Sequence, residues 1–170
     1  MLKRGSALLA FLCLALPLSA QRAPRILDKS NLVAWCVVPF DAKQRGPVER
    51  AQMLKRLGIT RLAYDWRDKD IPTFDQELDA LNEHGIKLHA FWFPFGLEPA
   101  KDKNVRVILD FLERRKVKTE LWASLSGGKA FEALSESGKL EAAARAVGWV
   151  AAEAGRIGCP VALYNHGGWY

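Results

Sequence analysis

Four polar residues that could move protons or bind hydroxyl groups lie near the ends of apolar segments of the chain. They are Asp65, His89, Asn165 and His166. Carboxylates and imidazoles are common general acids and bases, so Asp65 and His89 are the candidate catalytic residues. Asn165 and His166 could hydrogen-bond a substrate hydroxyl, and His166 could also bind a metal ion.

Each assignment has a structural alternative. Asp65 could form a salt bridge with Arg67 or Arg61, and His89 could be a hydrogen-bonded histidine of the core. A metal site needs three or four ligands, and His166 is the one ligand that its segment offers. The residue types therefore leave the catalytic and the structural interpretations open.

Several tryptophans lie in or just after the same apolar segments, among them Trp35, Trp66 and Trp92. Sugar rings have apolar C–H faces that stack on aromatic planes, so these three are candidate carbohydrate-binding residues. Large aromatic side chains are also common in protein cores. The alternative is that each indole fills the interior of the fold.

Five apolar segments would position these residues. They are almost continuously apolar, as is typical of parallel strands buried on both faces, and they cover residues 32–38, 59–66, 86–93, 117–124 and 160–165. Helices are predicted between them. The first begins at Gly46-Pro47 and ends at Gly58, and the second begins with a capping box at Thr73 and ends at Gly85.

Two further helices are predicted from their apolar faces, with a short helical piece over 129–134 between them. The face of the earlier one consists of Val105, Ile108, Leu109 and Leu112. The face of the later one consists of Leu140, Ala143, Ala144, Val147, Ala151 and Ala154.

An internal repeat sets the expected architecture. Leu57-Gly58-Ile59 and His84-Gly85-Ile86 each end a helix on glycine and open a strand on isoleucine. Such βαβ units build either a barrel or an open doubly wound sheet. The first strand lacks the glycine-rich turn of dinucleotide-binding sheets. We therefore predict an α/β protein of (β/α) TIM-barrel type, incomplete, with about five of the eight strand–helix units.

The N-terminus predicts export. Lys3 and Arg4 precede an apolar stretch too short to span a bilayer, so residues 1–20 are expected to be a signal peptide, with a retained anchor as the alternative. Residues 21–30 are then a linker and 31–170 the partial barrel, in a periplasmic or extracellular protein without stable membrane insertion after cleavage. Cys36 and Cys159 fall on non-adjacent predicted strands, which favours free thiols over a disulfide.

The net charge of +6, from 25 Lys+Arg and 19 Asp+Glu among 170 residues, is spread along the chain. No basic cluster interleaved with aromatic residues is present, so we expect no nucleic-acid binding.

The sequence resembles the xylose isomerase-like TIM-barrel superfamily, which includes sugar-phosphate isomerases and epimerases. The resemblance lies in residues 53–59, 81–90 and 161–168, the last containing the run Tyr164-Asn165-His166. It implies a divalent metal ion held by acidic and histidine ligands, and proton transfer beside a sugar carbonyl. In many members a metal-binding glutamate stands where this chain has Tyr164, and the other ligands come from later strands that this sequence does not contain.

Three functions are compatible with these features. The first is an exported, truncated sugar isomerase or epimerase acting on a small-molecule carbohydrate. The second is a carbohydrate-binding or interaction protein without catalysis, which the tyrosine at position 164 favours. The third is a non-functional fragment. Open sheet edges would in any case allow self-association.

Overall fold

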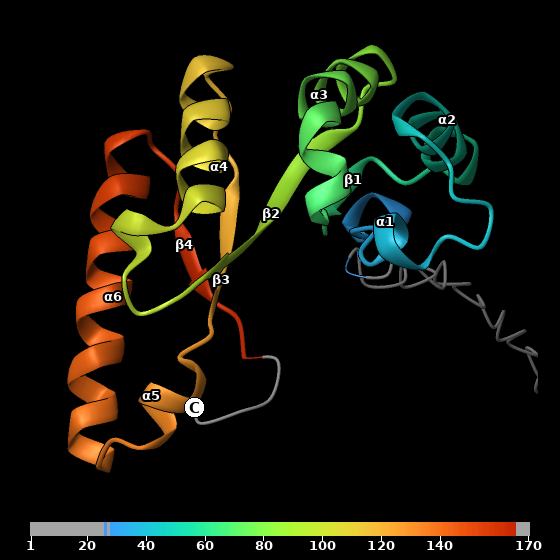
Figure 1. The fold of residues 1–170 in the computed structure, drawn as a ribbon. Helices are drawn as coiled ribbons and strands as arrows, with labels where there is room; N and C mark the ends of the chain where they lie inside the picture. The colour runs from blue at the N-terminus through green and yellow to red at the C-terminus, as the bar shows by residue number, and fades with distance from the viewer. Residues whose placement is uncertain (1–25, 27, 166–170) are drawn as a thin grey trace, which may run out of the picture.

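The computed structural model describes residues 26 and 28–165, and its centre is a four-stranded, all-parallel sheet that alternates with helices (Figure 1). The strands are adjacent in chain order: β1 (Arg61–Tyr64), β2 (Lys87–Phe95), β3 (Glu120–Leu125) and β4 (Val161–Leu163). The predicted α/β class and parallel sheet are confirmed. The strands of the described part do not close into a barrel.

The predicted first strand over residues 32–38 is wrong in its extent. Within this segment Ala34 forms a single parallel bridge, to Leu62 of β1. Cys36 has a left-handed backbone with φ of 58°, and the short helix α1 (Val37–Phe40) follows it. A short apolar run fits a strand and a buried helical turn equally well, so its composition could not separate the two.

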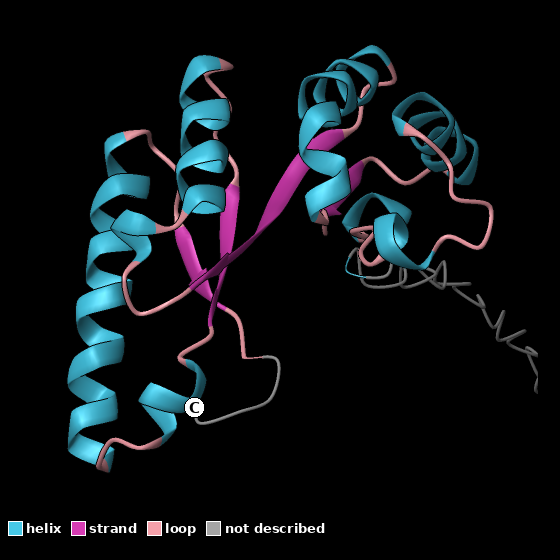
Figure 2. Ribbon diagram, in the orientation of Figure 1, coloured by secondary structure: helices cyan, strands magenta, loops and turns pink. Residues whose placement is uncertain are grey.

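Helices connect the strands (Figure 2). The longer ones are α2 (Pro47–Leu57), α3 (Phe74–Glu83), α4 (Lys103–Arg114) and α6 (Glu136–Arg156), and the shorter segments are η2 (Lys29–Asn31), η3 (Asp68–Thr73), η4 (Pro99–Lys101) and α5 (Gly128–Glu132). Parallel crossovers are almost always right-handed, so the consecutive strand order places the connecting helices on one face of the sheet. Figure 1 shows α2, α3, α4 and α6 as an arc outside the strands.

The packed core lies between this arc and the sheet. Phe91, Phe93 and Phe95 alternate along β2 and are at most 2% exposed. The ring of Phe91 contacts Phe74 of α3 at 5.3 Å and Phe111 of α4 at 6.1 Å between centroids. The predicted apolar face of α4 is confirmed, because its four residues are all buried.

Two helix predictions need correction. No capping box forms at α3, because the Thr73 hydroxyl donates to the Asp70 carbonyl at 2.8 Å and η3 runs directly into the helix. On α6 the buried stripe is Ala142, Ala146, Val150 and Ala154, whereas Leu140 is 62% exposed. Alanines lie all around this helix, so the sequence does not single out one stripe.

Candidate functional site

The face of the sheet that points away from the helices carries a cluster of aromatic side chains. Side chains alternate across a strand, so Trp92 of β2 and its paired residue Trp122 of β3 point opposite to the buried phenylalanines. Trp35 follows the bridge residue Ala34, and Tyr164 follows β4. We call Trp35, Trp92, Trp122 and Tyr164 the aromatic face.

Tyr164 is the centre of the aromatic face. Its ring stacks on Trp122 with an interplanar angle of 9° and a centroid distance of 5.8 Å. It meets Trp92 edge-on at 4.8 Å and Trp35 edge-on at 5.7 Å. Trp35 is 43% exposed, and the other three rings are half-buried, so the cluster presents aromatic surface to solvent.

Polar groups border these rings. The indole N–H of Trp122 donates to the Glu120 carboxylate at 2.7 Å. Ser124 lies two residues beyond Trp122 on the same face of β3. Asp65 follows β1, is 5% exposed, and accepts a hydrogen bond from Arg67 at 2.5 Å.

The thiol of Cys36 lies in the field of the Asp65 carboxylate. Burial and the neighbouring carboxylate raise the pKa of this thiol, so it is protonated at neutral pH and is not a nucleophile. Cys36 and Cys159 are both free, as predicted, although only Cys159 is fully buried. Burial, with smaller contributions from Cys36 and Asp65, also raises the pKa of Tyr164.

The predicted pair of Asp65 and His89 is not brought together. A bulge between Leu88 and Ala90 contains His89, and the strand pairing beyond it places Asp65 level with Trp92. His89 thus lies about three residues, roughly 10 Å, before Asp65 along the strand direction. This placement does not support direct cooperation of the two side chains in proton transfer.

The structure separates the remaining candidates. Trp35 and Trp92 belong to the aromatic face, but Trp66 is 3% exposed, packs on Phe74 and donates its indole N–H to the Trp92 carbonyl at 2.7 Å. Its ring has no face for a ligand. Asn165 is exposed beside Tyr164, and His166 lies outside the described residues.

The structure adds Tyr164, which was not among the predicted binding residues, and it places Trp122 beside Tyr164 in the same cluster. The signal that could have found them is register. Once β2, β3 and β4 are aligned as parallel neighbours, positions 92, 122 and 162 lie side by side, and residue 164 follows on the same face.

The described residues do not supply the metal site that the resemblance implies. Among residues 26 and 28–165, no three His, Cys, Asp or Glu side chains come together as metal ligands.

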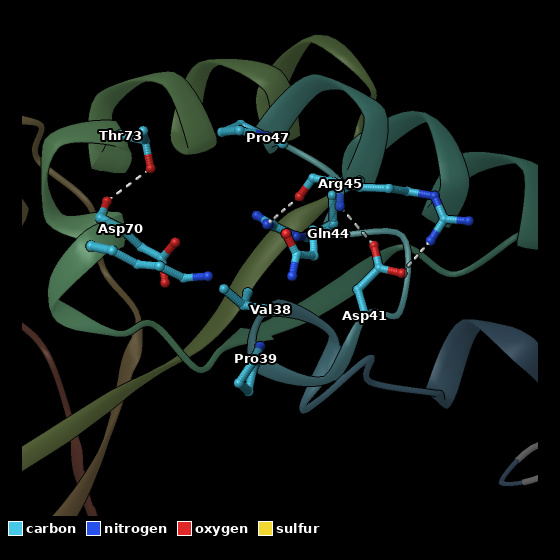
Figure 3. A pocket seen from close by; sticks show the side chains of 11 residues that line it. Val38, Pro39, Asp41, Gln44, Arg45, Pro47, Asp70 and Thr73 are labelled. Carbon is cyan, nitrogen blue, oxygen red and sulfur yellow. Dashed lines mark hydrogen bonds and ion pairs between the residues drawn. The ribbon is translucent and has the colours of Figure 1, made fainter.

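A hollow of about 230 Å³ lies between α1, the loop before α2 and η3 (Figure 3). Asp41 accepts hydrogen bonds there from the Arg45 guanidinium at 2.7 Å and from the Arg45 backbone at 2.9 Å. Arg50 pairs with buried Glu77 of α3 and donates to the Arg45 carbonyl at 2.8 Å. These contacts pair the main charged groups with one another, so the hollow has a structural role.

Comparisons of the chain with protein-family models, with curated proteins and with solved structures returned no match. Within the described part of the chain, no helix combines the length and the apolar composition needed to cross a bilayer.

Proposed function

We propose that the protein binds carbohydrate on the aromatic face. The observation that carries this proposal is the cluster of Trp35, Trp92, Trp122 and Tyr164 on the side of the sheet opposite the helices. A pyranose ring has apolar C–H faces and a rim of hydroxyls. The indoles would take the C–H faces, and Glu120, Ser124 and Arg67 border them with groups that can hydrogen-bond hydroxyls.

Binding is favoured over catalysis by the state of Asp65. Its carboxylate is buried and is paired with the Arg67 guanidinium. A general base must be able to reach the proton that it abstracts. Asp65 instead holds Arg67 in place, so we propose carbohydrate binding without isomerisation.

The proposal also includes the architecture and location of the protein. The unbroken order β1-β2-β3-β4 is that of a segment of a (β/α) barrel, and the aromatic face would line its interior. Export through a signal peptide over residues 1–20 would give the protein access to unphosphorylated sugars. The exposed Leu163 of β4 is available for pairing with another strand, including one from a second copy.

The test is isothermal titration of the full chain with cellotetraose, xylotetraose and maltotetraose. We expect measurable binding of at least one of them and a loss of about tenfold in affinity for Trp122→Ala. Trp149→Phe on α6, on the helix side of the sheet, is the matched control and should bind as the wild type does. Equal affinities of Trp122→Ala and wild type would reject the aromatic face as the binding site.

A further inference from the structure

A second site lies near the N-terminal ends of β2 and β3, whereas the aromatic face lies towards their C-terminal ends. It is a pocket of about 300 Å³ where the end of α3, the start of β2 and the α4–β3 connection meet. Four cationic side chains line it: Lys87, Arg115, Lys116 and Lys118. Among the described residues, no carboxylate lines it, and Asn82 adds an amide.

One of the four cations is held in a costly backbone conformation. In three of the helix-to-strand connections of the described chain, a glycine has a left-handed backbone conformation. These glycines are Gly58 after α2, Gly85 after α3 and Gly158 after α6. In the fourth connection, after α4, Lys116 has this left-handed conformation, with φ of 53°. A side chain in this region is disfavoured, and such strain is concentrated at functional sites.

The alternative is that these cations only neutralise the negative ends of helices. Arg115 at the end of α4 is accounted for in this way, because it pairs with Asp75 and Asp79 of α3. Lys118 lies two residues before β3, and its side chain lies against Gly158 at the end of α6, so it also offsets part of that helix end. Lys87 lies at the start of β2, and neither it nor Lys116 or Lys118 is in an ion pair between described residues.

The charges around the pocket do not cancel, and the balance is positive. Asp79 offsets Arg115, and the C-terminal ends of α3 and α4 together contribute about one negative charge. With a further half negative charge from the end of α6 beside Lys118, the three lysines leave about one to two positive charges in a pocket of about 300 Å³, which has room for an oxyanion that carries a further group.

We propose that this pocket binds a tetrahedral dianionic oxyanion, a phosphate or sulfate group carried by a small molecule or a lipid. Lys87, Lys116 and Lys118 provide ammonium donors for its oxygens, and Asn82 provides a neutral donor. The site is separate from the aromatic face, so the result of its test does not depend on carbohydrate binding.

The test is isothermal titration of the full chain with inorganic phosphate and with inorganic sulfate at constant ionic strength. We expect binding by the wild type and a loss of about tenfold or more in affinity for the double variant Lys87→Ser, Lys118→Ser. Lys129→Ser, which removes one positive charge from α5 outside the pocket, is the control for a general loss of charge and should retain wild-type affinity. Sedimentation with phosphatidylcholine vesicles, with and without phosphatidic acid, distinguishes a lipid source from a soluble one.

Lys116→Gly separates ligand binding from a purely structural role of the helix end. We expect it to raise the melting temperature and to weaken phosphate binding severalfold. Phosphate affinity that is unchanged in Lys116→Gly and in the double variant, or that falls equally in Lys129→Ser, would overturn the proposal.

Discussion

The ring of Tyr164 lies on the indole of Trp122 with only 9° between their planes. The strand pairing explains this stack. Trp122 is paired with Ala162, Tyr164 is two residues further along the same face, and its N–H donates to the Ala123 carbonyl at 2.9 Å. Through this stack Tyr164 joins Trp122 to Trp35 and Trp92.

Tyr164→Glu should abolish oligosaccharide binding. The substitution removes the stacked ring and places a carboxylate beside buried Asp65, whose charge already affects Tyr164. We expect at least a tenfold loss of affinity by titration with the tetraoses. Tyr164→Phe, which keeps the ring, should retain most of the affinity, and a glutamate variant that binds as well as the phenylalanine variant would contradict this role.

Lys116→Gly should stabilise the folded protein by about 1 kcal/mol, because glycine adopts the left-handed conformation without a Cβ penalty. Urea unfolding in phosphate-free buffer measures the change. Gly158→Ala is the reciprocal control. It forces a Cβ into a residue with φ of 76° and should destabilise the protein by a similar amount. A destabilised Lys116→Gly would show that the lysine is not strained.

Much of the fold could be predicted from the sequence, because parallel strands and glycine-terminated helices leave strong local signals. Gly58 and Gly85 mark helix ends that the structure confirms. The segment around Cys36 could not be predicted, since a short apolar run does not mark the residue at which the backbone turns left-handed.

The site was harder to predict than the fold. Trp35 and Trp92 were recognised from their place in apolar segments, but the same rule selected Trp66, which is buried. Which face a side chain occupies depends on register, and the bulge at His89 shifts that register by one residue. Strand alternation within one segment carries no information about such a shift.

Glu77→Ala should be among the most destabilising single substitutions. Glu77 and Arg50 are 2% and 4% exposed and pair with each other, so removing the carboxylate leaves a buried guanidinium without its counter-charge. We expect a loss of about 3–5 kcal/mol in the free energy of unfolding. The apolar double variant Arg50→Met, Glu77→Leu should recover most of it. A loss below about 1 kcal/mol in Glu77→Ala would contradict the buried pair.

Acid should weaken the contact between α3 and α4. Hydrogen bonds from Arg114 and Arg115 lower the pKa of Asp75 from 3.8 to about 2. Because the folded-state pKa lies below the unfolded-state value, the stabilisation is present above about pH 4 and is lost as the pH falls towards 2. Asp75 is 48% exposed in its side chain, so the contribution is below about 1 kcal/mol.

Urea unfolding of wild type and Asp75→Asn at neutral and acid pH measures this effect. The difference in stability between the two proteins should shrink from neutral pH to the most acid condition. Asp110→Asn, an exposed position on α4, should show no such convergence. If the difference in stability between wild type and Asp75→Asn were the same at every pH, the ion pairs of Asp75 with Arg114 and Arg115 would not be its cause.

The central claim is that sugar lies against the aromatic face, and the indole N–H signals of the tryptophans in a ¹⁵N-correlated NMR spectrum test it most directly. On titration of the full chain with the tetraose that binds best, the signals of Trp35, Trp92 and Trp122 should shift together and saturate at one affinity. The signals of buried Trp66 and of Trp149 on α6 should move much less. Saturating shifts confined to Trp149, or no shift in Trp35, Trp92 and Trp122 when sugar is bound, would contradict the account.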